Sequence, residues 1–475
     1  MKKEEGIRQF LIKHADEEPV SFHMPGHKGS AIYRKYGYGE FLDKIMDCDI
    51  TEIPGADNLF QYEDIILETM KKYKKLYEVR KSYLLVNGSS SGLIASILAS
   101  VEKGGKLLMA RNCHKSIFNA LPLGSIDPVY MYPDTIEEYG ILGAVSPETV
   151  AAHLEEDPEI QAVILPSPNY YGICSDIKAI SDICHAHGKI LIVDQAHGAH
   201  LKFMHRFGGE LGQDYPDCAE DSGADLVINS VHKTLASWTQ SAVLNVCSDK
   251  VNLQVLDDKL QQIESSSPSY PMMATLDINA DMLKNHGKEL MQEWAENIEY
   301  FYSNAFNIPG LVVLTPEGLD GTKINLDMSA YGLNGDQLEK LLNKEHIYPE
   351  LITGNIVMLM TGIGNTREHY DRLLKVLLNI ALTTPRAAEK PKQPESLTKV
   401  LERKAVPVHR ESVKLDDACG RVCASSIIPY PPGIPIACPG EVLDEEVIMY
   451  ISARREANEK VIGVDKDGKV LVGVE

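Results

Sequence analysis

Six short, largely apolar runs alternate with amphipathic stretches between residues 81 and 246. The runs cover residues 83–86, 106–110, 162–165, 190–193, 226–228 and 242–246. Apolar runs of this length, without a polar residue at every second position, indicate strands that are buried on both faces. The stretches between them, such as 92–101 and 176–187, have the spacing of helices. This alternation predicts an α/β fold with a mostly parallel central sheet.

The pattern changes on both sides of this region. Residues 1–50 mix short helical patterns with turns and are predicted to form an N-terminal arm, followed by a large domain over 51–265. Residues 266–385 contain a long helical pattern, roughly 282–306, and then shorter elements, which predicts a small α+β domain. A proline-rich and charged stretch at 383–394 is typical of a linker. Residues 386–475 then form a C-terminal domain with a stiff turn at 429–435.

Polar side chains follow several of the predicted strands. In open parallel sheets, ligands bind outside the carboxyl ends of the strands, so these segments are the place to look for a site. The first run leads into Asn-Gly-Ser-Ser-Ser-Gly at 87–92, which contains Ser89 and Ser90. Backbone amides and the positive dipole end of a helix suit a phosphate. A plain helix cap is the simpler interpretation, but a cap needs one serine rather than three.

Lys233 follows the run at 226–228, between a histidine and a threonine. Burial of an unpaired ammonium is unfavourable, so such a lysine has a lowered pKa or carries a covalent group. Lysine forms Schiff bases with carbonyl compounds, including pyridoxal phosphate (PLP); a surface lysine at a helix start is the alternative. His114 follows the second run, where a planar ligand could lie, and Asp194 follows the fourth, where it could pair with a protonated ring nitrogen. Together these residues predict one shared ligand.

Composition narrows the class of protein. The chain has 475 residues, 44% hydrophobic residues and a formal net charge of −21, which fits a globular enzyme and argues against nucleic acid as a partner. We find no apolar run long enough for a membrane span and no apolar signal region after the N-terminal Met, and nine cysteines show no disulfide framework. These features predict a cytoplasmic protein. Histidines at 185, 187, 197, 200 and 205 leave a metal site as a remote alternative.

The assembled motifs resemble the Orn/Lys/Arg decarboxylase family, PLP enzymes of fold type I, the aspartate aminotransferase-like fold. The resemblance covers nearly the whole chain and points to the shorter members, which lack an N-terminal wing domain. It is carried by Met-Pro-Gly-His-Lys at 24–28, the segments 87–92, 111–116, 194–197, 230–233 and 266–271, and the C-terminal segments 430–435 and 439–441.

The resemblance implies a role for each of these residues. Lys233 would carry PLP, Asp194 would pair with its ring nitrogen, and His114 would stack on the ring, with Ala196 against the other face. Ser265 of the neighbouring subunit would join the phosphate site, which implies a homodimer with active sites at the subunit interface. His197 would contact the cofactor's phenolic oxygen or the substrate. The phosphate ligands within the chain would be Ser89, Ser90, Ser230 and His232; His27 and Glu441 would be substrate residues, with Glu441 facing the distal cation.

The implied activity is decarboxylation of a basic L-amino acid in polyamine synthesis. Arginine, giving agmatine and CO2, is favoured; lysine and ornithine, giving cadaverine and putrescine, are the alternatives. An aminotransferase or a C–C lyase of the same fold would share the lysine, the aspartate and the phosphate site. The turn at 24–28, the context of His114 and the C-terminal unit favour a decarboxylase. A non-catalytic relative and a metal-dependent hydrolase are more remote, because the lysine and the aspartate are both present.

Overall fold

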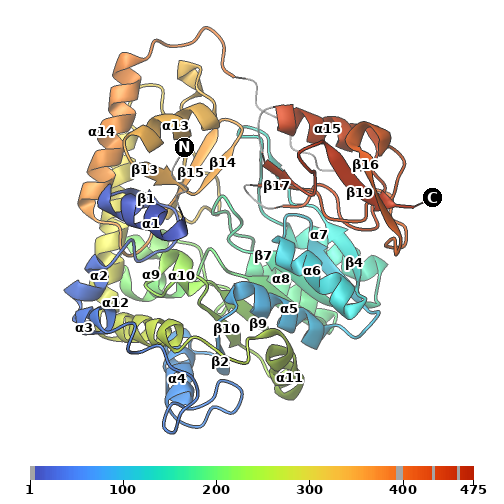
Figure 1. Cartoon of the computed structure of the whole chain (residues 1–475), viewed down its shortest axis with the longest axis horizontal. Coiled ribbons are helices and arrows are strands. Elements are labelled where there is room, and N and C mark those ends of the chain that lie inside the picture. The colour runs from blue at the N-terminus through green and yellow to red at the C-terminus, as the bar shows by residue number, and fades with distance from the viewer. Residues whose placement is uncertain (1–5, 392–399, 431–433, 457–459, 475) are drawn as a thin grey trace.

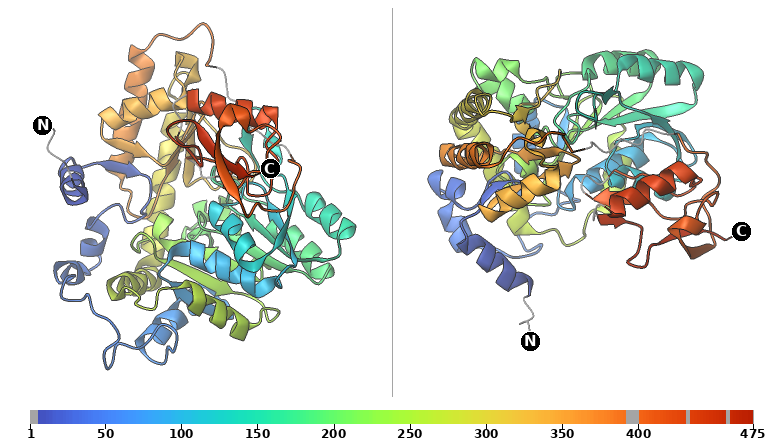
Figure 2. Two further views of the ribbon diagram at one scale, coloured as in Figure 1. Left: turned by 45° about the vertical axis from the view of Figure 1, so that its right-hand side comes forward. Right: turned by 90° about the horizontal axis from the view of Figure 1, so that it is seen from above.

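We analysed a computed structural model, which describes residues 6–391, 400–430, 434–456 and 460–474. Figure 1 shows a large sheet covered by helices, a smaller domain above it, and a C-terminal unit beside both. The N-terminal helices lie along the outer side of the small domain and of the helices below it, as both views in Figure 2 show.

A seven-stranded sheet forms the centre of the large domain, in the order β2-β10-β9-β8-β7-β3-β4. Only β10 runs antiparallel to its neighbours, and the other pairs in this sheet are parallel. All six predicted strands are present, so the prediction of an α/β fold with a mostly parallel sheet is confirmed. The strands are β2 (Lys81–Leu85), β3 (Lys106–Ala110), β4 (Asp127–Met131), β7 (Ile160–Pro166), β8 (Ile190–Asp194), β9 (Leu226–Asn229) and β10 (Ala242–Val246).

Strand β4 is the member of the sheet that the apolar pattern did not reveal. It lies at the end of the sheet and pairs only with β3. Its five residues include Pro128 and are only partly buried. A strand at a sheet edge tolerates proline and need not be apolar on both faces, so it lacks the signal that marked the others.

Helices cover both faces of the sheet and create two separate cores. Side chains alternate between these cores along a strand: Tyr83 and Leu85 of β2 point into one, and Leu84 into the other. The first core contains α5 (Gly88–Ser100), α6 (Lys115–Gly124), α7 (Pro147–Glu156), α8 (Ile177–Ala186) and α11 (Leu253–Ile263); the second contains α4 (Ile65–Tyr77), α9 (Leu201–Phe207), α10 (Val231–Thr234) and α12 (Tyr270–Ala305).

Helix α12 is longer than its pattern predicted. It has 36 residues and starts at Tyr270, although the sequence pattern suggested a start near 282. Ser269 caps it by accepting a hydrogen bond from the Met272 N–H, and Pro271 occupies its first turn, where a missing N–H is harmless. The serines and prolines at 264–271 therefore end one helix and begin the next. Helix α12 contacts α4 and α9 of the large domain and α14 of the small one.

The small domain has a four-stranded antiparallel sheet in the order β11-β12-β15-β14. Strand β1 of the N-terminal arm pairs in parallel with β13 of this domain. The elements are α1 (Ile7–Asp16), β1 (Val20–Phe22), α2 (Ala31–Lys35) and α3 (Gly39–Asp43) in the arm; and β11 (Val312–Val313), β12 (Lys323–Asp327), α13 (Gly335–Lys344), β13 (Ile347–Pro349), β14 (Leu351–Thr353), β15 (Ile356–Met360) and α14 (Arg367–Thr383) in the domain. A short hairpin, β5 (Thr135–Ile136) and β6 (Ile141–Leu142), belongs to the large domain.

The C-terminal unit has a hydrophobic core of its own. Its elements are β16 (Arg410–Lys414), β17 (Ile428–Tyr430), α15 (Glu445–Glu456), β18 (Lys460–Ile462) and β19 (Lys469–Gly473). The last three residues of the predicted linker, 392–394, and the centre of the predicted stiff turn, 431–433, lie outside the described residues. The predicted domain boundaries stay a prediction; they fall between α3 and α4, between α11 and α12, and after α14. No helix among the described residues is long and apolar enough to span a membrane.

Candidate active site

A cavity opens at the carboxyl ends of the parallel strands, where the loops after β3, β7 and β8 meet the first turns of α5 and α10. It is lined by Ser89, His114, Pro166, Pro168, Asn169, Tyr170, Asp194, Ala196, His197 and Lys233. Six residues that the sequence singled out at separate strand ends therefore lie around one space: Ser89, His114, Asp194, Ala196, His197 and Lys233.

Lys233 lies on α10, a single helical turn that follows β9 directly. Burial lowers the pKa of the Lys233 ammonium; the Asp194 and Glu350 carboxylates oppose this shift, and the positive charge of Lys323 adds to it. A neutral amine is the form of lysine that attacks a carbonyl carbon. The position thus suits a lysine that binds a carbonyl-containing cofactor covalently.

Asp194 is the last residue of β8 and is buried. Burial raises the pKa of its carboxyl, while the Lys233 ammonium and a hydrogen bond from the Ala196 N–H, 3.2 Å from Oδ1, act in the opposite direction. Among the described residues, that N–H is the one hydrogen-bond donor to this carboxylate. A buried carboxylate with so few partners has room for a cation, such as a protonated ring nitrogen.

His114 caps α6 with its ring rather than with a hydroxyl. Its Nδ1 accepts a hydrogen bond from the Ser116 N–H at 3.3 Å and lies 2.8 Å from Ser116 Oγ. Burial lowers the pKa of His114 to about 3, with smaller contributions from the charges of Lys233 and Lys115. The imidazole is therefore neutral at physiological pH and fixed in orientation, as a ring that stacks on a planar cofactor must be.

The first turn of α5 supplies the candidate phosphate site. Ser89 lies in this turn, and the Ser230 hydroxyl donates a hydrogen bond to the Ser89 hydroxyl at 2.9 Å, which joins the start of α5 to the start of α10. The turn itself is held by Glu264, whose carboxylate accepts the Val86 and Asn87 N–H groups at 3.0 Å each. Hydroxyls at the amino end of a 13-residue helix provide donors and a favourable dipole for an anion.

The other predicted cofactor residues do not line the cavity in this single chain. Ser90 is in the same turn of α5 as Ser89, and His232 turns its Nδ1 to the Ser241 carbonyl oxygen, 2.7 Å away. Ser265 lies on the surface after α11. Because Ser265 was expected to act in a neighbouring subunit, its position within one chain leaves that role a prediction.

The turn at 24–28 packs against the cofactor lysine's helix. The Gly26 N–H donates to the His232 carbonyl at 2.8 Å, and a Cβ at Gly26 would lie 2.4 Å from the Thr234 carbonyl carbon. Only glycine fits this close approach. His27 lies beside this contact but not in the cavity lining, and burial lowers its pKa to about 4. A substrate contact by His27 stays a prediction.

His197 carries an unsatisfied polar atom into the cavity wall. Its Nδ1 is buried and has no hydrogen-bond partner among the described residues. Its ring lies edge-on to that of Tyr170, with 5.3 Å between the centroids. Burial holds the pKa of His197 well below its ordinary value, so the ring is neutral. A polar ligand in the cavity would satisfy this nitrogen. The lining as a whole therefore fits PLP: a lysine with a lowered pKa, an available carboxylate, a flat imidazole and a phosphate site.

The substrate contact that the resemblance implies for Glu441 stays a prediction. Glu441 is outside the cavity lining, buried in the C-terminal unit, and its Oε2 accepts a hydrogen bond from the Cys438 N–H at 2.7 Å. The same oxygen lies 3.3 Å from the Arg111 guanidinium, which also donates to the carbonyls of Pro435 at 2.6 Å and Ile436 at 3.0 Å. In this chain the Glu441 carboxylate binds Arg111, three residues before His114, and joins the C-terminal unit to the loop after β3.

Several site residues gave no signal in the sequence. Asn169 and Tyr170 follow β7 and line the cavity, and applying the strand-end rule to that strand as well would have found them. Glu350 lies between β13 and β14 of the small domain, where no such rule applies; burial raises its pKa, and the charge of Lys233 opposes that rise.

The histidine cluster is dispersed: His185 pairs with Asp225, and His200 with Asp320. Within the described residues, no group of three potential metal ligands forms.

The comparison with protein families agrees with this site. Residues 7–324 match the Orn/Lys/Arg decarboxylase major domain, and residues 382–472 match the Orn/Lys/Arg decarboxylase C-terminal domain. The chain belongs to the Orn/Lys/Arg decarboxylase family. The predicted family and the predicted enzyme class are therefore confirmed: this is a PLP-dependent decarboxylase of a basic amino acid.

Individual relatives cover almost the whole chain. The uncharacterized protein YaaO of Bacillus subtilis is 32% identical over 453 residues, which are 93% of this chain and 92% of the relative. An arginine decarboxylase of Bacillus subtilis is 29% identical over 469 residues, 95% of this chain and 94% of the relative. Among solved structures, the lysine decarboxylase of Francisella novicida has a TM-score of 0.75 at 20% identity, covering 98% of this chain and 80% of that one. This likeness confirms the predicted fold.

Replacement of Lys233 tests the cofactor lysine. We expect Lys233→Ala to lose the visible absorbance that a lysine-bound PLP gives, because no other neutral amine lines the cavity among the described residues. Lys115→Ala, which changes an exposed lysine next to His114, is the matched control and should keep the absorbance. The measurement is an absorption spectrum of each variant after incubation with PLP and gel filtration. A retained covalent adduct in Lys233→Ala would identify a different lysine.

Replacement of Arg111 tests the attachment of the C-terminal unit. Arg111→Met leaves the Glu441 carboxylate buried without its cation, so we expect the free energy of unfolding to fall by about 3 kcal/mol. Arg403→Met is the control: Arg403 bridges the same two units through an exposed pair with Asp127 and should cost less than about 1 kcal/mol. Denaturant unfolding measures both. Equal effects of the two changes would contradict a special role for the buried pair.

Proposed function

We propose that this enzyme decarboxylates L-arginine to agmatine and CO2 and thereby supplies an amine for polyamine synthesis. The observation that supports a PLP decarboxylase in the geometry is the partly buried Lys233, which lines one cavity with Asp194 at the carboxyl ends of the strands. The similarity to an arginine decarboxylase over 95% of the chain supports arginine as the substrate. Lysine and ornithine are the alternatives within the family, with cadaverine and putrescine as their products.

The site residues have distinct tasks in this reaction. When bound, PLP accepts the electron pair that departing CO2 leaves behind. Lys233 holds the cofactor and then makes way for the substrate's amino group, for which its burial-lowered pKa prepares it. Asp194 holds the proton on the ring nitrogen, and His114 fixes the plane of the ring. The substrate's α-carboxylate must stand out of that plane, so positioning is the main contribution of the protein.

Glu350 is our candidate for the partner of the substrate's distal cation, in place of Glu441. Its carboxylate is largely buried, accepts one hydrogen bond, from the Met24 N–H at 2.9 Å, and interacts electrostatically with Lys233. A basic substrate bound to PLP extends away from Lys233 and brings a guanidinium or an ammonium to such a carboxylate. A guanidinium matches a carboxylate with two parallel hydrogen bonds, which is consistent with arginine.

A homodimer with shared active sites fits the surface around Ser265. The neighbouring segments 55–66 and 260–273 line two adjoining hollows, and Leu84 contributes to both. Ile53 and Ile65 on this side are more than half exposed, at 54% and 53%. Exposed apolar side chains gathered around hollows are typical of protein interfaces. We propose that a second copy of the chain covers this face and that Ser265 reaches the phosphate site of its partner.

A cytoplasmic location completes the proposal. All nine cysteines are free thiols in the structure, and five of them are buried. Free thiols in this number fit a reducing compartment better than an oxidising one.

The substrate is identified by its product. Incubation of the purified enzyme and PLP with arginine, lysine and ornithine separately, followed by chromatography of the amines, should yield agmatine as the main product. Cadaverine or putrescine in its place would move the assignment to lysine or ornithine. A keto acid without CO2 release would instead contradict decarboxylation.

Replacement of Glu350 tests the distal contact. We expect Glu350→Gln to raise KM for arginine at least about tenfold with a smaller change in kcat, because the contact forms equally in the bound substrate and the transition state. Glu345→Gln, on the exposed surface just before β13, is the control and should leave both constants unchanged. Steady-state kinetics at saturating PLP separates the two constants. An unchanged KM in Glu350→Gln would exclude Glu350 from substrate binding.

A further inference from the structure

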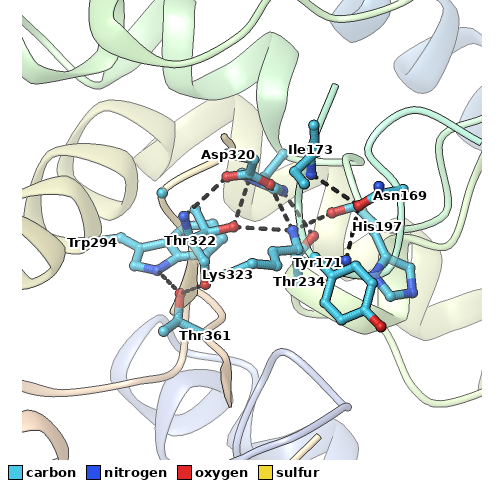
Figure 3. A network of polar contacts seen from close by, with 12 residues as sticks. Asn169, Tyr171, Ile173, His197, Thr234, Trp294, Asp320, Thr322, Lys323 and Thr361 are labelled. Atoms are coloured by element: carbon cyan, nitrogen blue, oxygen red, sulfur yellow. Dashed lines mark hydrogen bonds and ion pairs between the residues drawn. The ribbon is translucent and has the colours of Figure 1, made fainter. Parts of the chain in front are cut away.

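A fully buried ion pair lies behind the active site, where the small domain meets the loops of the large one. It joins Asp320 and Lys323, the latter at the start of β12, and neither side chain is exposed to solvent. Their closest approach is 2.7 Å, between Lys323 Nζ and Asp320 Oδ2. Figure 3 shows this pair at the centre of a network of polar contacts.

All three N–H donors of the Lys323 ammonium have acceptors. They are Asp320 Oδ2, Thr322 Oγ1 at 3.0 Å and the main-chain carbonyl of His197. The third acceptor belongs to the active-site loop after β8, and the His197 ring lines the cavity. The small domain thus holds the backbone of a cavity residue directly, by a charge-assisted hydrogen bond.

Asp320 extends the network towards the cofactor lysine. Its Oδ1 accepts the Thr322 N–H at 3.0 Å and lies 3.2 Å from His200 Nε2. His200 Nδ1 in turn lies 3.3 Å from the hydroxyl of Thr234, the residue after Lys233. Burial alone raises the pKa of the Asp320 carboxyl, but the charges of Lys323 and His200 hold it below its usual range, so the carboxylate is ionised.

The same segment also holds the loop after β7. The Asp320 N–H donates to the Gly172 carbonyl at 2.7 Å, and the Asn325 amide donates to the Tyr171 carbonyl at 2.9 Å. A Cβ on Gly172 would lie 2.8 Å from Lys323 Cβ, so this loop is in direct contact with the lysine stem. That loop carries Asn169 and Tyr170 into the cavity lining.

A buried ion pair is a poor device for stability alone, because desolvation of both charges offsets their attraction and well-packed apolar residues often serve as well. This pair instead has acceptors and contacts on three active-site segments: the loops after β7 and β8 and the end of α10. Lys233 faces Asp194 from β8, Glu350 from the small domain and Lys323 from β12, and the last of these is the one that disfavours its protonation.

We propose that Lys323, with Asp320 as its counter-ion, is a positioning residue that fixes the His197 loop against PLP and places a positive charge near Lys233. The proposal rests on the PLP site and not on the choice of arginine as substrate. It predicts two separable effects of Lys323: a hydrogen bond that orders the loop, and a charge that keeps the lysine–cofactor linkage less readily protonated.

Two substitutions separate these effects. Lys323→Gln removes the charge and keeps an N–H donor for the His197 carbonyl, whereas Lys323→Met removes both. We expect both variants to raise the pKa of the visible absorbance band of lysine-bound PLP, because each removes a positive charge that disfavours protonation. PLP should bind at least about tenfold more weakly to Lys323→Met, and within about threefold of wild type to Lys323→Gln.

The control is Asp225→Asn. Asp225 is also fully buried, pairs with His185 and accepts the Leu191 N–H, but it lies at the opposite end of the sheet from the cavity. Its replacement should lower the melting temperature and leave the absorbance pKa and the PLP affinity unchanged. If either Lys323 variant behaves in this way, with only its melting temperature reduced, Lys323 is merely structural and the proposal is overturned.

Thr322→Val provides a second test of the positioning role if the Lys323 variants do not give folded protein. It removes one acceptor of the ammonium and keeps the charge, so the proposal expects weaker PLP binding with an unchanged absorbance pKa. Wild-type affinity for PLP in this variant would overturn the positioning role. Each readout is taken without substrate, so a wrong substrate assignment leaves these results unaffected.

Discussion

The electrostatic balance at the partly buried Lys233, which shares its cavity with Asp194, is the constraint on which the rest of the structure depends. A lysine in this environment is neutral only if the surrounding groups do not favour its protonation, yet Asp194 must stay close enough to serve the ring nitrogen. The parallel sheet meets both demands, because β8 and β9 are neighbours and present the two residues at adjacent carboxyl ends. Two residues of the small domain also act on the charge of Lys233: the Glu350 carboxylate favours its protonated form, and Lys323 disfavours it. The positions of these charged residues, more than the shapes of the elements that carry them, account for which elements meet around Lys233.

Much of this arrangement could be predicted from sequence, and the reason is periodicity. Strands buried on both faces are recognisable as runs of apolar residues. The polar residues that follow parallel strands must lie at the same edge of the sheet. Prediction failed where no period exists. Strand β4 is a half-buried edge, and the start of α12 is set by a cap and a proline rather than by apolar spacing. Glu350 and Lys323 come from the small domain, whose approach to the sheet is a matter of tertiary packing. The ion pair of Glu441 could not be predicted either, because a motif names a residue without naming its neighbour, Arg111.

The C-terminal unit has a clearer part in the structure than its remote position suggests. Arg111 follows β3 and donates to carbonyls of that unit, and its guanidinium lies 5.4 and 5.2 Å from the ring centroids of Phe118 and Tyr130. Three residues later the same loop presents His114 to the cavity. His114 therefore lies on a segment that is fixed from both sides, by the sheet and by the C-terminal unit.

The pairing of β1 with β13 has a consequence for synthesis of the protein. Val20–Phe22 leave the ribosome near the start of translation, but their partners, Ile347–Pro349, follow only after most of the chain. The turn after β1 carries Gly26 and packs on the helix of Lys233, and it also reaches its final position only after these partners are made. The large domain can collapse during translation, whereas the pairing of the arm with the small domain forms last. A chain that ends before residue 347 therefore lacks the β1–β13 contact, although every residue that lines the cavity, the last of them Lys233, has already been made.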